Sequence, residues 1–362
     1  MIKILHTADW HMDAPLREFN EIQRRELRAA SLRLPGQIAD LCIREGCDLC
    51  LISGDVFDGV WTPEGYEAVY RALERMDVPV FIAPGNHDPY REMSVWTIEQ
   101  WPENVYLFRS PEISSFRVAE LDCRIFGAAF TSNQSGSMLE GFFAECDERY
   151  ALLTMHGDPT NASSPYNPVT AAQIREAGID YAALGHIHAK GQFDAGAGIC
   201  VWPGCPMGHG FDETGTKGVV IAELGETVQT RFVPLDTIRF FDHRVEVGID
   251  PIAALEAVLP PGGSRDHFRI TLTGEAEPDA VQRLEPRLAD YPNLTLRDET
   301  TAPCDIWEGA GEDSLCGLFF GILRDAAADA DPETAQKLEL AAKISRRILQ
   351  KREVELPCKF FP

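Results

Sequence analysis

Histidine, aspartate and asparagine residues recur in five short clusters along the first half of the chain. The clusters are Asp9-Trp10-His11, Gly54-Asp55-Val56-Phe57-Asp58, Gly85-Asn86-His87-Asp88, His156 and Gly185-His186-Ile187-His188. Carboxylate, amide and imidazole groups without thiolates form a mixed ligand set that suits manganese or iron and disfavours a structural zinc site. Two such ions about 3.5–4 Å apart can activate a water and stabilise displacement at phosphorus. The clusters together therefore predict a two-metal phosphoesterase site.

The spacing inside two clusters suggests how the ligands are shared between ions. Asp9 and His11 are two residues apart, and in an extended segment such residues point to the same side, so both can bind one ion. His186 and His188 have the same spacing on a loop, where each can serve a different ion. Glycine precedes ligands where the backbone must turn sharply and pass close to the ions, at Gly54, Gly85 and Gly185.

A short apolar run directly precedes each cluster. The runs cover residues 2–5, 49–52, 78–82, 151–155 and 181–184. Runs of this length bounded by Gly or Pro indicate buried strands. Ligands just beyond the carboxyl ends of strands lie where layered α/β folds place their sites. We therefore expect five strand ends to meet at one crevice.

The remaining pattern of the first 235 residues alternates strands with helices, which is typical of a layered α/β fold. Helices are expected over about 18–45, 62–76, 138–148 and 170–177. Pro35-Gly36 predicts a kink or two helices in the first of these, because proline inside a helix removes a hydrogen bond and clashes with the preceding turn. Strands are expected within 104–130, 198–223 and 228–233, the last two stretches closing a second sheet.

The pattern changes near residues 235–241, where we place a domain boundary. A small βαβαβ domain is predicted over 240–300, with strands at 244–247, 268–272 and 294–296, helices at 251–259 and 278–291, and no metal-ligand cluster. Two helices, about 314–328 and 332–351, follow in a segment covering 304–362. The second has a basic face that could contact DNA or a partner, or could be solvated surface: Lys343, Arg346, Arg347, Lys351 and Arg352.

Composition limits the classes of function. The 362 residues allow about two or three domains, and the formal net charge of −24 argues against binding nucleic acid by general attraction. Two aspartates cancel only part of the charge of two divalent ions, so the crevice itself would be locally cationic. No leader precedes the first cluster and no apolar stretch approaches about 18 residues. We expect a cytoplasmic protein without a membrane span.

Cysteine usage gives no sign of a disulfide framework. The ten cysteines are scattered, and several lie inside apolar runs where a reduced thiol behaves as a small hydrophobe. Cys47 and Cys50 match a CxxC pattern, but no second pair follows at zinc spacing. We expect both to be buried thiols.

The order DxH, GDxxD, GNHD, H and GHxH resembles the calcineurin-like metallophosphoesterases over roughly the first 235 residues. The resemblance implies a four-layer sandwich of two mixed β-sheets flanked by helices in a domain covering 1–235, with the small domain as a cap and the helical segment as a docking site. Further segments resemble SbcD/YhaO-type DNA repair exonucleases: His6–His11 with Asp13–Leu16, Gly54–Gly59, Pro203-Gly204 and Glu213–Gly218. Asp58 stands where SbcD proteins commonly carry histidine, which favours the YhaO-like branch.

The resemblance also implies two sets of metal ligands joined by Asp55, which bridges the two ions. The first set is Asp9, His11 and His188, and the second is Asn86, His156 and His186. His87 would be left unligated beside the scissile phosphate, as a general acid or a positioning group. The ions are expected to be manganese, with iron or magnesium as alternatives.

The function that the resemblance implies is a manganese-dependent DNA nuclease, with double-strand exonuclease and single-strand endonuclease activity. Its partner would be an SMC-like coiled-coil ATPase on a separate chain, because the sequence has no GxxxxGK[ST] phosphate loop. A homodimer stays open. Two alternatives remain. The acidic charge favours a small-molecule phosphodiesterase or phosphatase, and a non-enzymatic scaffold is disfavoured by the intact ligands.

Other residues near the clusters have roles that the sequence leaves open. His6, on the first strand, is expected to be a packed or supporting histidine, and His209 could reach the substrate or have no role. Stacking on bases competes with core packing, which we favour, for Tyr90, Trp96 and Trp101. Contact with backbone phosphates competes with simple solvation for Arg17, Arg24, Arg25 and Arg28.

Overall fold

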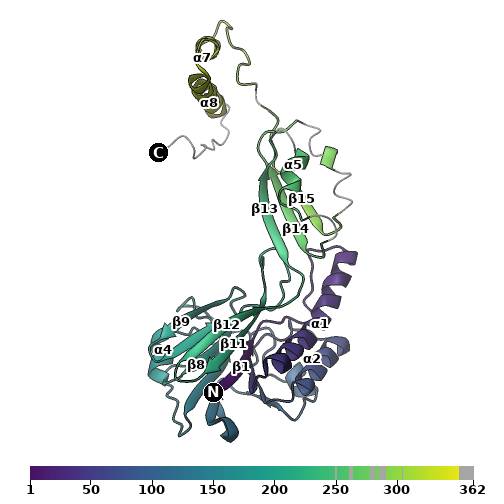
Figure 1. The fold of residues 1–362 in the computed structure, drawn as a ribbon, viewed down its shortest axis with the longest axis vertical. Coiled ribbons are helices and arrows are strands. Elements are labelled where there is room, and N and C mark those ends of the chain that lie inside the picture. Colours follow the sequence, from purple (N-terminus) through teal and green to yellow (C-terminus); the bar gives the residue numbers. More distant parts are fainter. Residues whose placement is uncertain (249–250, 261–263, 278–281, 285–290, 304, 350–362) are drawn as a thin grey trace. The chain divides into compact units, whose positions relative to one another are not determined.

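The computed structural model describes residues 1–248, 251–260, 264–277, 282–284, 291–303 and 305–349 (Figure 1). The chain divides into two compact units. The first, unit 1, consists of Met1–Asp242 with Asn293–Thr295 and the described part of Gly263–Arg269. The second, unit 2, is formed by the rest of the described residues. All five clusters of polar residues belong to unit 1.

The first sheet of unit 1 has six strands in the order β12-β11-β1-β2-β3-β4. Four neighbouring strands are parallel: β1 (Ile2–Thr7), β2 (Leu49–Ile52), β3 (Val80–Ile82) and β4 (Val105–Leu107). Two antiparallel strands complete the sheet: β11 (Gly218–Leu224) and β12 (Val228–Pro234). Because parallel strands end at the same edge of a sheet, the segments that follow β1, β2 and β3 emerge side by side.

The second sheet has the order β5-β6-β7-β8-β10-β9. Its parallel centre consists of β6 (Cys123–Gly127), β7 (Tyr150–His156), β8 (Tyr181–Gly185) and β10 (Gly198–Trp202). The edges are antiparallel: β5 (Ser114–Val118) and β9 (Gly191–Ala195). His156 is the last residue of β7, and His186 directly follows β8. The second sheet therefore positions the two polar clusters that contain these histidines.

Three hydrophobic clusters hold the layers of unit 1 together. One lies between the two sheets, since it joins Ile4 and Phe81 of the first sheet with Leu152 and Tyr181 of the second. Another joins the first sheet to α1 (Glu21–Glu45) and α2 (Pro63–Met76). The third joins the second sheet to α4 (Ala171–Ala177). The order helix, sheet, sheet, helix confirms the predicted layered α/β fold with two mixed sheets.

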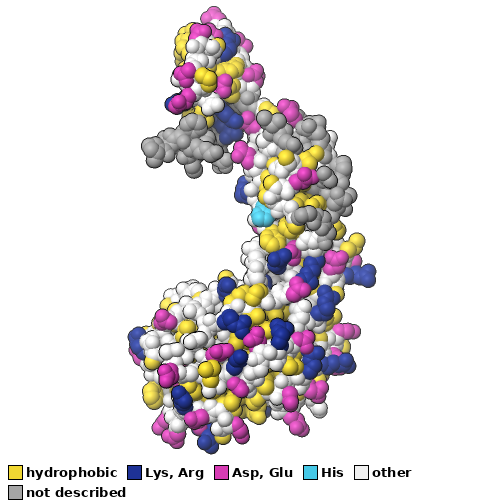
Figure 2. Space-filling model, viewed as in Figure 1, with side chains coloured by type: hydrophobic (Ala, Val, Ile, Leu, Met, Phe, Trp, Pro, Cys, Tyr) yellow, Lys and Arg dark blue, Asp and Glu magenta, His cyan; other side chains and the backbone are white. Residues whose placement is uncertain are grey.

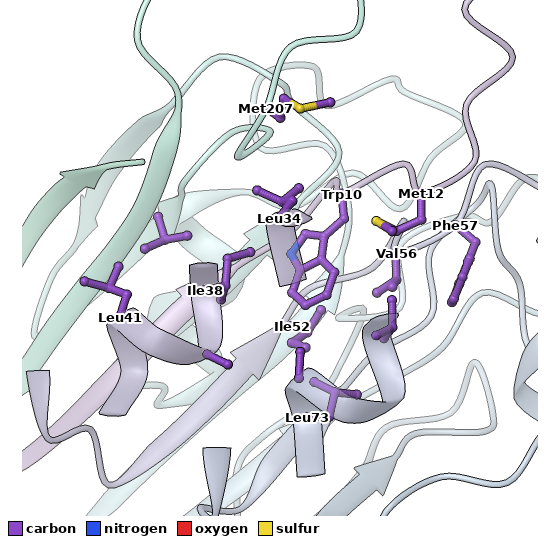
Figure 3. Packing of buried hydrophobic residues seen from close by; sticks show 14 of the residues in the cluster. Trp10, Met12, Leu34, Ile38, Leu41, Ile52, Val56, Phe57, Leu73 and Met207 are labelled. Carbon is purple, nitrogen blue, oxygen red and sulfur yellow. The ribbon is translucent and has the colours of Figure 1, made fainter. Parts of the chain in front are cut away.

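The hydrophobic cluster that joins the first sheet to α1 and α2 includes Trp10, which lies between Asp9 and His11 in the sequence. The fully buried Trp10 packs beside Leu34, Ile52 and Leu73 (Figure 3). Its indole Nε1 donates a hydrogen bond of 2.8 Å to Thr7 Oγ1. A short helix, α3 (Val95–Ile98), contributes Trp96 to the same cluster. Tyr90 and Trp101 are half-buried and pack against it, which supports core packing over base stacking for these aromatic residues.

Three predictions about secondary structure in unit 1 are wrong. Residues 21–45 form one α-helix that contains Pro35, so the alternative of two helices is wrong. The buried face of the helix, including Leu34 and Ile38, packs into the core and outweighs the local cost. Residues 138–148 form turns, and Gly141 takes a left-handed φ of 69°. Strands β11 and β12 do not close the second sheet, because β11 pairs with β1 and completes the first.

Side chains cap the beginnings of two helices in unit 1. The Thr62 hydroxyl accepts a hydrogen bond of 3.0 Å from the Gly65 N–H, and Pro63 is the first residue of α2. Thr170 forms a capping box with Gln173 at the start of α4. These caps fix where each helix begins, and therefore the length of the loop that leads into it.

The described part of unit 2 carries the three-stranded sheet β13-β14-β15 together with helices. The strands are β13 (Phe240–Glu246), β14 (His267–Thr273) and β15 (Leu294–Asp298). The first two or three residues of each strand belong to unit 1. Short helical turns lie at α5 (Pro251–Glu256) and η2 (Gln282–Leu284). Most of the helix predicted at 278–291 falls outside the described residues. No metal-ligand cluster is found in the part of unit 2 that the structure describes.

The helical pair of unit 2 consists of α7 (Leu315–Ala328) and α8 (Pro332–Leu349), which pack against each other. The predicted basic face of α8 is largely engaged within the unit. Lys343 and Arg347 pair with Glu275, and Arg346 lies over the Phe320 ring and donates to backbone carbonyl groups. Lys351 and Arg352 lie outside the described residues. This arrangement favours a structural role for the basic face.

Two further sequence expectations can be compared with the described residues. None of the helices there combines the length and apolar character that crossing a membrane requires. The cysteines described in the structure are free thiols, and Cys47 and Cys50 are both buried. The roles predicted for 240–300 as a cap and for 304–362 as a docking segment stay predictions.

His267, at the start of β14, is a buried histidine in an aromatic environment. Its ring centroid lies 5.4 Å from that of Phe19 and 5.1 Å from that of Phe240. Neither ring nitrogen has a hydrogen-bond partner among the described residues. Burial lowers the pKa of His267 from 6.5 to about 4. The imidazole is therefore neutral in the folded protein over a pH range in which the unfolded chain binds a proton.

We predict that His267→Phe reduces the loss of stability on acidification. Because the folded pKa lies below the unfolded value, the wild type loses stability as the pH falls from 6.5 toward 4, by up to about 3 kcal/mol from this residue. Urea unfolding at pH 7 and pH 4.5 measures this as the difference between the two proteins. Equal acid sensitivity of wild type and variant would contradict the prediction.

Candidate metal centre

The segment after β1 brings Asp9 and His11 into the crevice by a left-handed turn. Asp9 has a φ of 55° and His11 a φ of 44°. Their backbone N–H groups donate to the carbonyl oxygens of Gly54 and Asp55, both at 3.0 Å. The expected extended arrangement of these two residues is therefore wrong, although both side chains are buried at the site. The hydrogen bonds to the loop after β2 replace extended geometry as the reason that they converge.

Asp55 itself is anchored by the loop after β3. Its Oδ1 accepts a hydrogen bond of 2.9 Å from the backbone N–H of His87. A Cβ atom at Gly85 would lie 2.1 Å from the same oxygen, so only glycine fits there. The Asp88 carboxylate joins the two loops, because it accepts from the backbone N–H groups of Asp55, Val56, Phe57 and Gly85 at 2.8–3.2 Å.

The first group of converging side chains is Asp9, His11 and His188, each of which offers a ligand atom within 4.8 Å of the others. The Nε2 atoms of His11 and His188 lie 3.1 Å apart. The Nδ1 atom of His11 lies 3.3 Å from Asp58 Oδ1, and that of His188 contacts Glu213 Oε1. Because a carboxylate only accepts, each Nδ1 carries a proton, and the two Nε2 atoms are turned toward each other. A positive charge, either a metal ion or a proton, is favoured between them.

The second group is Asp9, Asp55 and His156, with ligand atoms again within 4.8 Å. His156 Nδ1 donates to the Ser53 carbonyl at 2.9 Å. Its Nε2 therefore faces two oxygens, Asn86 Oδ1 at 2.9 Å and Asp55 Oδ2 at 3.2 Å. Burial lowers the pKa of His156, but the Asp55 carboxylate outweighs it and raises the pKa to about 9. This position attracts positive charge, which a metal ion supplies as well as a proton does.

His186 lies beside the second group. Its backbone N–H donates to Asp9 Oδ1 at 2.9 Å, and its ring centroid lies 5.2 Å from that of His156. The centroid of the Tyr166 ring lies 4.9 Å from that of His186. The structure thus brings all seven predicted ligands together, from the carboxyl ends of β1, β2, β3, β7 and β8.

His87 differs from the predicted ligands in its exposure, since 48% of its side chain is accessible. Its Nδ1 lies 2.6 Å from Asp58 Oδ1, and this hydrogen bond raises the pKa of His87. His87 lines a hollow of about 390 Å³ together with His11, Asp58 and His188. We call this the central hollow. A protonated imidazole at its wall can donate a proton to a group bound inside.

Glu213 is a functional residue that sequence reasoning missed. Its carboxylate contacts His188 Nδ1 through one oxygen and, through the other, accepts from the His209 backbone N–H at 2.6 Å. Burial raises the pKa of Glu213, but the hydrogen bonds from both histidines hold it well below its usual range. Histidines that bind metals commonly donate their other ring nitrogen to such a carboxylate. The sequence offered only a segment resemblance at Glu213, because 25 residues separate it from His188.

His6 lies apart from the ligand groups. Its Nδ1 is 2.9 Å from the Tyr181 hydroxyl, and its Nε2 is 3.1 Å from the Leu184 carbonyl oxygen and 3.2 Å from Ser53 Oγ. Burial lowers its pKa to about 3. The residue is a neutral packing histidine that joins the two sheets beneath the site.

Comparison with known proteins identifies the family. The family model described as calcineurin-like phosphoesterase matches residues 2–190, which contain every one of the converging side chains except Glu213 and His209. The chain belongs to the calcineurin-like phosphoesterase family. Members are hydrolases that act on phosphoester bonds and use a pair of divalent metal ions.

Named relatives of this phosphoesterase include two bacterial proteins. It is 27% identical over 242 residues to metallophosphoesterase YhaO of Bacillus subtilis, a match covering 62% of this chain and 57% of the relative. It is 22% identical over 341 residues to the SbcD component of nuclease SbcCD from Staphylococcus epidermidis, covering 81% of this chain and 84% of the relative. Among solved structures, a dimetal phosphatase from Danio rerio matches at 13% identity with a TM-score of 0.40, covering 64% of this chain and 98% of that one.

We predict that Glu213→Ala weakens metal binding by about 10- to 100-fold, because His188 loses the carboxylate that orients its ring. Manganese titration by calorimetry of the metal-free protein measures the change. The control is Glu226→Ala, since Glu226 is exposed in the turn between β11 and β12. Identical affinity in wild type and Glu213→Ala would show that the carboxylate does not support the site.

Proposed function

We propose that this phosphoesterase is a two-metal DNA nuclease of the SbcD/YhaO type that hydrolyses phosphodiester bonds, with manganese as its preferred ion. The observation that carries the proposal is the relationship to the SbcD component of nuclease SbcCD, which extends over most of both chains. The mixed ligand set without thiolates supports manganese or iron. The activities proposed are double-strand exonuclease and single-strand endonuclease.

In this proposal the converging side chains divide between the two ions, with Asp55 shared by both. The first ion would be held by Asp9, His11 and His188, and the second by Asn86, His156 and His186. The short distance between the Nε2 atoms of His11 and His188, and the oxygens that face His156 Nε2, support the assignment. When bound, the two ions supply an activated water and offset the charge of the phosphate during in-line displacement.

The remaining step falls to side chains of the chain itself. Asp58 accepts from His87 Nδ1 and so fixes the orientation of the ring at the central hollow. The raised pKa of His87 keeps it protonated over a wider range, which suits proton donation to the leaving oxygen. The backbone N–H of His87 donates a hydrogen bond to Asp55 Oδ1. This bond fixes the position of His87 relative to Asp55, the ligand shared by both ions.

The acidic net charge does not oppose the proposal at the site itself. On the face of unit 1 seen in Figure 2, Lys and Arg side chains lie among Asp and Glu side chains and form no single basic field. Together with the formal net charge of −24, this makes general attraction to DNA weak. Two divalent ions carry four positive charges into a crevice that has two aspartate ligands, so the local field favours a phosphate. Affinity for long DNA would therefore need a source other than the charge of this chain.

A partner is the proposed source of that affinity. The helix α7 exposes four large apolar residues with the spacing i, i+3, i+4, i+7, namely Leu315, Leu318, Phe319 and Ile322. Such a stripe on one helix face is suited to packing against another helix. The SbcCD name of the relatives supports an SMC-like coiled-coil ATPase as the occupant. The ATPase would also contribute DNA binding.

We predict that two substitutions in the site separate metal binding from turnover. His87→Ala should retain both ions but lose about 100- to 10,000-fold in kcat, because it removes the proton donor. Asp55→Ala should lose metal as well, because it removes the ligand shared by both ions. Metal content by mass spectrometry and hydrolysis of bis(p-nitrophenyl) phosphate measure the two effects. Equal loss of metal in both variants would overturn the role of His87.

The DNA assignment is tested directly with the full chain and manganese. We expect degradation of linear double-stranded DNA from its ends and cleavage of single strands, with stimulation by the ATPase. Asp55→Ala is the negative control. If the protein hydrolyses bis(p-nitrophenyl) phosphate but leaves all DNA intact, alone and with the ATPase, it is a small-molecule phosphodiesterase or phosphatase.

A further inference from the structure

A second hollow of about 370 Å³ lies beside the central hollow in unit 1. We call it the side pocket. Its apolar wall includes Leu32, Val60 and Met207, and its polar groups include Asp13, Arg28 and His209. Its volume is in the range of small-ligand sites. None of the steps proposed above uses it.

The side pocket and the central hollow share a wall. Ala14, Leu16 and His209 line both. The two hollows therefore adjoin at these three side chains. His209 is the polar member of this wall, and its ring centroid lies 5.8 Å from that of His11.

His209 is held with one ring nitrogen uncommitted. Its Nδ1 lies 3.3 Å from Glu213 Oε2, and its backbone N–H donates to the same oxygen. Its Nε2 is buried and has no hydrogen-bond partner among the described residues. A buried imidazole nitrogen without a partner is costly unless a ligand satisfies it. The fixed ring is thus placed to bond a molecule that reaches from one hollow into the other.

The chemistry of the side pocket favours an uncharged flat group over a second phosphate. Besides Arg28, two carboxylates line it, Asp13 and Glu64. The Asp13 carboxylate is fixed by hydrogen bonds from the Thr62 N–H at 2.8 Å and hydroxyl at 3.0 Å. Carboxylates repel phosphate but accept from the N–H groups of a nucleobase. The apolar wall suits the face of the base.

We propose that the side pocket binds the nucleoside attached to the scissile phosphate, and that His209 Nε2 hydrogen-bonds this nucleoside. The inference rests on the proposed phosphodiester chemistry of the central hollow and assigns its substrate class. Arg28, Ser31 and Leu32 lie on one face of α1, so this helix forms the floor against which the base packs.

The test compares ligands with and without a nucleoside by calorimetry on the manganese-loaded full chain. The probes are inorganic phosphate, thymidine 5′-monophosphate and thymidine 3′-monophosphate. In the wild type, at least one nucleotide should bind about tenfold more tightly than phosphate. Leu32→Trp, which fills the pocket, should abolish this advantage while leaving phosphate affinity within about twofold. His209→Gln should reduce it about fivefold.

The matched control is Ile43→Trp, which adds the same side chain at an exposed position near the far end of α1. It should retain the nucleotide advantage. The proposal is wrong if neither nucleotide binds more tightly than phosphate in the wild type, or if the advantage survives Leu32→Trp. If the protein binds a nucleotide more tightly than phosphate but does not cut DNA, the nuclease assignment is wrong and the nucleoside pocket is still supported.

Discussion

The site depends on one buried carboxylate that binds no substrate. Asp88 accepts hydrogen bonds from four backbone N–H groups in the loops after β2 and β3, and so fixes Asp55 and Asn86 relative to each other. The loop after β1 is tied to the same framework through the carbonyl oxygens of Gly54 and Asp55. Backbone groups left unpaired in a buried crevice would be costly. The geometry of the ligands is therefore set by main-chain hydrogen bonds before any ion binds.

Within this framework, the ligand atoms face one another at distances that favour a bound positive charge, either a metal ion or a proton. The His11 and His188 nitrogens lie 3.1 Å apart, and His156 Nε2 faces two oxygens. The partners on the far side of each ring, Asp58, Glu213 and the Ser53 carbonyl, determine which nitrogen keeps its lone pair. These supporting groups explain how an acidic chain maintains a crevice suited to phosphate.

Much of this arrangement could be predicted from the sequence, because parallel strands place their carboxyl ends together and polar clusters follow those ends directly. The converging ligands follow from that rule, whereas the fold of two mixed sheets was implied by the family resemblance. Other features depend on contacts between distant segments. Glu213 reaches His188 through contacts of the loop before β11, such as the hydrogen bond from the Cys205 N–H to the His188 carbonyl oxygen, which strand patterns do not specify. The left-handed turns at Asp9 and His11 are imposed by the neighbouring loop, and Pro35 is tolerated because core packing outweighs its local cost.

Those left-handed turns have a thermodynamic consequence. Asp9, His11, Asp55 and His186 all adopt positive φ values, between 44° and 91°, where a residue with a Cβ is disfavoured by about 1–2 kcal/mol. Glycine would adopt these φ values at a lower free-energy cost, but it has no side chain that could coordinate an ion. The catalytic crevice is consequently a region of stored backbone strain that the surrounding sandwich must outweigh. Substitutions selected only for stability would replace these residues by glycine and remove metal ligands. Stability and metal-dependent activity are therefore opposed at these positions.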